Sequence, residues 1–145
     1  MRQDSWREAA QEYRQVLEFD ATNSDALEHL GDIALGKGGN PVEALAFYRA
    51  SVEASSGASA SLWSRLGVAA KEGNNLAAAE EAYARALAID STYADAWFNL
   101  GNLQVLQGLK EASSSYRKAA RYSRDPKLTR SARLRAEEIS GTTKF

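Results

Sequence analysis

Few side chains in this sequence have the type and spacing that chemistry requires. Asp25, His29 and Asp32 fall at i, i+4 and i+7, so on a helix they would share one face and could converge on a divalent ion. The chain has one histidine and no cysteine, which excludes multi-histidine and thiolate metal sites, disulfides and a cysteine nucleophile. We therefore interpret the three residues as a solvated polar helix face and predict no metal site.

Two further patterns are candidates for catalysis or cofactor binding. The segment Gly36-Lys37-Gly38-Gly39 lacks the G-x4-G-K-[S/T] spacing of a phosphate-binding loop, and we interpret it as a turn between helices. The pairs Glu80-Glu81 and Glu137-Glu138 are adjacent, so on a helix their carboxylates do not face one another as paired acid/base groups would. The sequence thus predicts no catalytic residues and no cofactor, and we expect a chain that is not an enzyme.

The composition indicates which elements carry these side chains. Of the 145 residues, 44% are hydrophobic and 26% are charged, a balance typical of a folded domain. Alanine is abundant and proline occurs only twice, which favours helix over strand. No run of about 18 apolar residues is present, and the start lacks an apolar leader. We expect a cytoplasmic chain without a membrane span, although the absence of cysteine does not separate cytosol from periplasm.

An internal repeat organises the chain. Leu-Gly pairs occur at 30–31, 66–67 and 100–101, spaced by 36 and 34 residues, and a large residue stands three positions before each Leu. A second motif, Ala-x3-Tyr, occurs four times at intervals of 35, 35 and 33 residues. Its four copies are Ala9/Tyr13, Ala44/Tyr48, Ala79/Tyr83 and Ala112/Tyr116. Spacings of i, i+3, i+4 and i+7 within each copy predict two amphipathic helices per repeat.

Small and polar residues mark where these helices pack and begin. Glycine and alanine at the repeated positions let helix backbones approach closely, while Trp, Leu and Tyr fill the space between them. We predict helix N-caps at Ser24, Ser59 and Asn75, and at Asn40, which precedes a proline.

The pattern W-x2-L-G followed by A-x3-Y resembles the tetratricopeptide repeat family, and the match is fullest from Trp63, Leu66 and Gly67 through Tyr83. The resemblance implies an all-α, right-handed α-solenoid of helix-turn-helix repeats. It departs from the family where Ala34, Ala70 and Gln104 replace an aromatic residue. The predicted divisions are a half-repeat helix at 4–20, repeats at 24–55, 59–90 and 94–123, and a capping helix at 126–139, with the final GTTKF as a tail.

The resemblance also implies a function. In this family the first helix of each repeat lines a concave channel that holds a peptide or protein segment, which makes the chain a non-catalytic interaction module or scaffold. The matching positions in this sequence are Asp25, Glu28, His29, Asp32, Ser61, Ser64, Arg65, Val68, Glu72, Asp95, Phe98, Asn99, Asn102 and Leu106.

The predicted channel is acidic at one end and partly apolar at the other. Family members that clamp the acidic C-terminus of chaperones use Lys, Arg and Asn here, whereas this chain has Glu28 and Asp32, so the resemblance excludes that class of ligand. We expect a neutral to basic protein segment, with apolar contacts from Val68, Phe98 and Leu106.

Charge is distributed unevenly along the chain. Residues 1–116 carry a net charge of -7 and residues 117–145 a net charge of +6. The basic end fits an acidic partner, the acidic body of a second copy or a solvated end helix. Little aromatic interleaving accompanies its arginines beyond Tyr116 and Tyr122, so nucleic acid is disfavoured.

Two alternatives to a free-standing interaction module remain open. The first predicted helix matches the second helix of a repeat, so the chain starts in mid-repeat. A start in mid-repeat is consistent with a regulatory or targeting segment of a larger protein or enzyme. It also fits a structural homo-oligomer assembled through that unpaired helix or through contacts between the acidic body and the basic tail.

Overall fold

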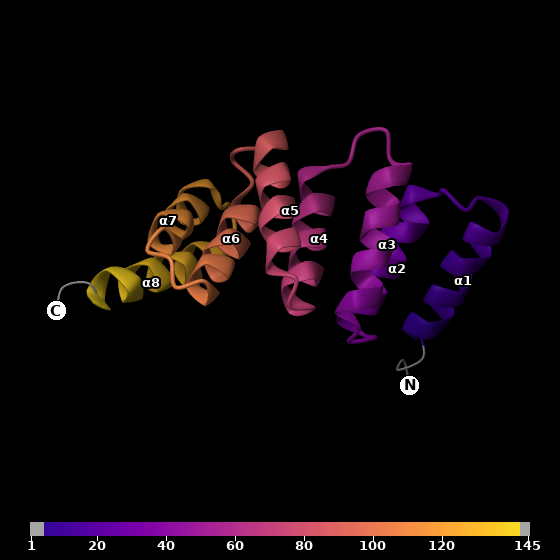
Figure 1. Ribbon diagram of the computed structural model, residues 1–145, viewed down its shortest axis with the longest axis horizontal. Coiled ribbons are helices and arrows are strands. Elements are labelled where there is room, and N and C mark those ends of the chain that lie inside the picture. Colours follow the sequence, from indigo (N-terminus) through magenta and orange to yellow (C-terminus); the bar gives the residue numbers. More distant parts are fainter. Residues whose placement is uncertain (1–4, 143–145) are drawn as a thin grey trace.

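The computed structural model describes residues 5–142, and over this range the chain is helical with no strand. The helices follow one another in a row, with α1 and α8 at opposite ends (Figure 1). No helix within the described range combines the length and apolarity needed to cross a membrane. The helices are α1 (Ser5–Phe19), α2 (Ser24–Gly36), α3 (Pro41–Ala54), α4 (Ala60–Glu72), α5 (Leu76–Ile89), α6 (Ala94–Leu106), α7 (Ala112–Tyr122) and α8 (Pro126–Thr142).

Each helix packs on its neighbours in the chain. We group α2 with α3, α4 with α5 and α6 with α7 as three helical hairpins, and α1 and α8 pack on the two ends of this stack. The first helices of successive hairpins also meet, as α4 and α6 do. The core consists of alanine, leucine and tyrosine side chains held between hairpins. The predicted all-α solenoid is confirmed.

Close helix crossings explain the repeated glycines and tyrosines. In each hairpin a buried tyrosine ring lies directly against a glycine of the preceding helix, and each ring is at most 1% exposed. A Cβ atom added at the glycine would approach the ring to 2.6, 2.5 and 2.8 Å in the three hairpins, closer than packed atoms allow. The three pairs are Gly31 with Tyr48, Gly67 with Tyr83 and Gly101 with Tyr116.

Three of the four predicted helix N-caps are confirmed. The side chains of Asn40, Ser59 and Asn75 each accept a backbone N–H in the first turn of the helix that they precede. The prediction for α2 is wrong by one residue, because Asn23 caps this helix and accepts the N–H of Ala26 at 2.9 Å. Ser24 is instead the first helical residue.

The last helix is longer than expected. It begins at Pro126 and runs to Thr142, past the predicted end at 139. The predicted tail is therefore helical at Gly141 and Thr142, and its remaining residues, 143–145, lie outside the described range.

Candidate functional site

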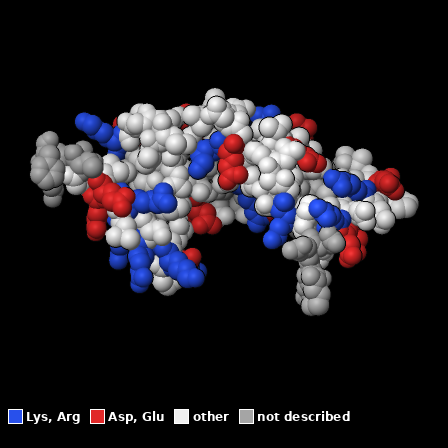
Figure 2. All heavy atoms as spheres, turned by 90° about the horizontal axis from the view of Figure 1, so that it is seen from below, with Lys and Arg blue, Asp and Glu red and all other residues white. Residues whose placement is uncertain are grey.

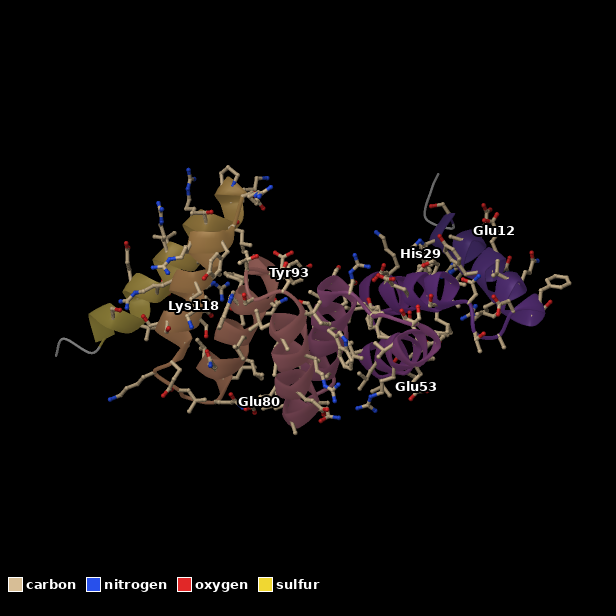
Figure 3. The ribbon with its side chains drawn as sticks, turned by 90° about the horizontal axis from the view of Figure 1, so that it is seen from above. Glu12, His29, Glu53, Glu80, Tyr93 and Lys118 are labelled. Carbon is tan, nitrogen blue, oxygen red and sulfur yellow. The ribbon has the colours of Figure 1, made fainter. Side chains whose placement is uncertain are left out.

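We define the groove as the surface that α2, α4, α6 and α8 form together along one side of the row of helices. All fourteen predicted site residues lie on the first three of these helices. The row of helices is bowed, and Figure 3 shows His29 of α2 on the opposite edge of the ribbon from Glu53 of α3 and Glu80 of α5. The space-filling view is hollowed between its two ends (Figure 2).

At the α2–α4 step, one guanidinium holds two carboxylates. Arg65 of α4 donates to Glu28 at 2.9 Å and to the two carboxylate oxygens of Asp32 at 3.0 and 3.3 Å. The hydroxyl of Tyr48 donates to the same Asp32 at 2.6 Å. Burial raises the pKa of Tyr48, and the hydrogen bond to Asp32 raises it further because an acceptor carboxylate favours the protonated phenol.

The α6–α8 step repeats this arrangement with different chemistry. Arg135 of α8 donates to the amide oxygen of Asn102 at 2.8 Å, and the hydroxyl of Tyr116 donates to the same oxygen at 2.7 Å. The guanidinium lies 5.1 Å from the ring centroid of Phe98, within cation–π range. A neutral amide and an aromatic ring therefore replace the two carboxylates.

Arg135 is a groove residue that the sequence analysis missed. By sequence it falls in the basic end at 117–145, and no groove position was predicted for it. The available signal was a spacing: Arg65 follows Asp32 by 33 residues, and Arg135 follows Asn102 by 33 residues. This register places Glu137 at the position that glycine occupies in the repeats, two residues after the arginine.

The middle step, between α4 and α6, is weaker in polar contacts. Asn99 donates to Ser64 at 3.3 Å, and Ser64 itself is 3% exposed, so it lies beneath the groove surface. Val68 stands directly after its glycine, where the other two hairpins place Asp32 and Asn102.

The substitution at Val68 leaves a hydroxyl without an acceptor. Within the described residues, the buried Tyr83 hydroxyl has no hydrogen-bond partner. Its pKa is raised, first by burial and then by the nearby negative charge of Glu72. An unpaired buried hydroxyl costs free energy, so this step is the weakest part of the polar network.

The remaining predicted residues make fewer contacts. The His29 ring meets Tyr13 of α1 edge-on, with centroids 4.9 Å apart. The side chains of Asp25, Ser61 and Asp95 form no hydrogen bond or ion pair with other described residues. Leu106 is 63% exposed at the end of α6.

The α2 face with Asp25, His29 and Asp32 has two side chains that contact other helices of the protein, those of His29 and Asp32. Asp32 is held by Arg65 and Tyr48, and the described residues contain no group of three His, Cys, Asp or Glu side chains arranged to hold a metal ion. The groove therefore offers hydrogen-bonding and charged groups for recognition, together with the exposed apolar surface of α6.

Two family models match the sequence. One, described as a tetratricopeptide repeat, matches residues 1–59, and the other, described as a TPR repeat, matches residues 67–108. Together they span more than half of the chain. No curated protein matched the sequence.

Solved structures give the same result. The chain is similar to the MamA protein, with 27% identity and a TM-score of 0.80 over 94% of this chain and 74% of that one. It is similar to the TPR domain of Arabidopsis OM64, with 25% identity and a TM-score of 0.69 over 79% and 94% of the two chains. It shares its fold with the first TPR of Spaghetti (RPAP3) bound to the HSP90 peptide SRMEEVD, at 21% identity and a TM-score of 0.68 over 83% and 96%.

The Leu-Gly and Ala-x3-Tyr landmarks pack against one another as the repeat requires, and both sequence and structure comparisons agree with them. The chain belongs to the tetratricopeptide repeat family.

Proposed function

We propose that this chain is an interaction module that holds a neutral to basic segment of a partner protein in its groove. Tetratricopeptide repeat proteins are generally non-catalytic interaction modules, which supports the class of function. A preformed scaffold of packed hairpins supports the mechanism, because it loses little order when a segment binds.

The preference for a basic segment rests on one observation, that Glu28 and Asp32 both pair with Arg65. Two carboxylates meet a single guanidinium, so the cluster keeps a net negative charge, and the side chains of Glu28 and Asp32 remain 23% and 41% exposed. Asp25 lies on the same helix and makes no ion pair with another described residue. A lysine or arginine of a bound segment would complete this cluster.

The other end of the groove favours different ligand groups. The Phe98 ring and the exposed Leu106 on α6 offer apolar surface, and Arg135 adds one positive charge above Phe98. A segment with a basic residue toward α2 and an apolar residue toward α6 fits these groups. The acidic peptide SRMEEVD held by the RPAP3 domain has the opposite charge character, in keeping with the carboxylates on α2 of this chain.

A positional peptide array tests this proposal. The wild-type chain should favour Lys or Arg at one position of the bound peptide, and Asp25→Lys with Glu28→Gln should weaken the selected peptide about tenfold. The control is Glu80→Lys with Glu81→Gln, which makes the same charge change on exposed positions of α5. An unaltered peptide preference in the groove variant would remove the acidic end from the proposal.

A further inference from the structure

A second surface lies at the C-terminal end of the stack, outside the groove. A cavity of about 370 Å³ opens between α7 and α8, with Ala120 and Ala136 on its floor. Its rim carries Arg117, Arg121 and Arg133. We call this cavity the α7–α8 seat. Lys and Arg side chains gather at this end of the molecule (Figure 2).

The seat corresponds to a cavity inside the stack. That internal cavity has walls from α3, including Arg49, Val52 and Glu53, and from α4, including Trp63 and Leu66. Each of these residues has an equivalent in the seat, 68 positions later for α3 and 70 positions later for α4. The equivalent residues are Arg117, Ala120, Arg121, Arg133 and Ala136.

A third helix lines the internal cavity, whereas only two of the described helices line the seat. Inside the stack, α5 supplies the third wall through Ala78, Glu81 and Ala82. Within the described residues, no helix follows α8 to fill the equivalent place. The two walls of the seat thus have the shape that receives an amphipathic helix, with an alanine floor for its apolar side.

Charge distinguishes the two cavities. The internal cavity is lined by one arginine, Arg49, and two carboxylates, those of Glu53 and Glu81. In the seat, an arginine stands in the place of Glu53, so three arginines face one carboxylate, that of Glu137. A helix docked here needs acidic side chains where α5 has Ala78 and Glu81, and it keeps a small apolar residue where α5 has Ala82, which is 1% exposed inside the stack.

Glu137 restricts which helix can dock. It occupies the position of Gly67, where a Cβ atom would lie 2.5 Å from the Tyr83 ring. A helix with tyrosine at that place cannot approach α8 as α5 approaches α4. This steric conflict also applies to α1 of a second copy, which carries Tyr13 at the matching position of its Ala-x3-Tyr motif.

We propose that the α7–α8 seat binds an acidic amphipathic helix of a partner protein, with a small residue facing Glu137. The apolar floor between two helices favours a helix over a nucleic acid, which would use the arginines alone. This contact is separate from the groove and does not depend on what the groove binds.

The probe is a synthetic helix with the sequence of Leu76–Ile89 carrying Ala78→Glu and Tyr83→Ala, so that Ala82 stays as its apolar contact with the floor of the seat. A covalent side-chain link on its outward face keeps it helical, because free helices of this length are marginal in water. Fluorescence anisotropy should show saturable binding to the wild-type chain that weakens with added salt. A matching peptide that keeps Tyr83 should bind about tenfold more weakly or worse.

Two variants of the chain locate the contact. Arg121→Glu with Arg133→Glu should weaken the probe about tenfold or more, while Lys37→Glu with Lys110→Glu, an equal charge change in exposed turns, should not. Glu137→Gly should admit the peptide that keeps Tyr83, whereas Ser131→Gly, an exposed glycine control on the same helix, should not. Thermal melting of each variant verifies that it is folded.

Several results would overturn the proposal. No saturable binding of the probe, equal binding by the arginine variant, or equal binding of the two peptides to the wild-type chain would each do so. Capture of a duplex DNA oligonucleotide at the same arginines without binding of the probe would assign the surface to nucleic acid. Salt-sensitive self-association in sedimentation, lost in the arginine variant, would assign it to a second copy.

Discussion

The two ends of the groove share one geometry and differ in charge. At the α2–α4 step, Arg65 and the Tyr48 hydroxyl meet on the carboxylate of Asp32. At the α6–α8 step, Arg135 and a tyrosine hydroxyl meet on the amide of Asn102. In both places the acceptor directly follows the glycine of its helix. Glycine and tyrosine thus set the helix crossing, and the next residue sets the charge of the groove.

The middle step shows what this separation permits. Val68 takes the acceptor position without altering the packing of Gly67 on Tyr83, and only the tyrosine hydroxyl loses its partner. The surface between the two polar ends becomes apolar at small cost to the fold. Recognition can therefore vary along the groove while the scaffold stays the same.

The largest effect is expected from breaking the element that all three hairpins share. Gly67→Leu would place side-chain atoms inside the Tyr83 ring, since even a Cβ atom lies 2.5 Å from it. We expect a loss of about 3 kcal/mol or more in the free energy of unfolding, at the upper end of what overpacking costs, measured by urea denaturation. Gly36→Ala is the control, because nothing lies within 4 Å of a Cβ there. Equal stability of the two variants would contradict the close crossing.

Removing the hydrogen-bond acceptor at each end of the groove compares the charged α2–α4 step with the neutral α6–α8 step. Asp32→Ala leaves a buried hydroxyl unpaired and takes one carboxylate from Arg65, so we expect a loss of about 1.5–3 kcal/mol, the range for hydrogen bonds to charged groups. Asn102→Ala should cost about 0.5–1.5 kcal/mol. Chemical denaturation of both variants at low and high salt makes the measurement, and only the Asp32 effect should shrink with salt. A larger cost at Asn102 would reverse the comparison.

The sequence predicted the hairpins because their packing is local and repetitive. Gly31 and Tyr48, like their counterparts, lie in one repeat, and the motif that joins them recurs at a nearly constant interval. The polar network joins different repeats, so it depends on how far one hairpin is shifted relative to the next. The predictions placed Arg65 in the groove but gave it no partner.

Arg135 was missed for a related reason. A spacing of 33 residues after Gly101 would put the next repeat glycine at Leu134, whereas the contacts of Arg135 give that place to Glu137. The connection from α7 to α8 sets this offset, and periodicity does not fix the length of a connection. Sequence spacing therefore predicts the scaffold better than the residues that meet across it.

Raising the pH above 10 should lower the free energy of unfolding through two buried tyrosines, Tyr48 at the acidic end of the groove and Tyr83 in its middle. Burial raises the pKa of Tyr48 and Tyr83 above the ordinary value of 10.0, so the unfolded chain loses these protons first. The stability is intact below pH 10 and falls as the pH rises above it, by about 1.4 kcal/mol per pH unit for each tyrosine. Urea titrations near pH 9 and above pH 10 should show a shallower loss in Tyr48→Phe with Tyr83→Phe than in the wild-type chain. Parallel pH dependences would mean that neither phenol is held protonated.

The smallest expected effect is a change in stability on removing one tyrosine hydroxyl. Its sign should differ between the middle of the groove and its C-terminal end. Tyr116→Phe removes a hydroxyl that donates to Asn102 at 2.7 Å, and we expect it to cost about 0.5–1.5 kcal/mol. Tyr83→Phe removes a buried hydroxyl that has no partner among the described residues, so it should leave stability unchanged or raise it by up to about 1 kcal/mol. Both changes keep the ring against its glycine, so the packing term cancels when their urea midpoints are compared. A loss at Tyr83 as large as that at Tyr116 would mean that its hydroxyl has an acceptor and that the middle step is as well paired as the ends.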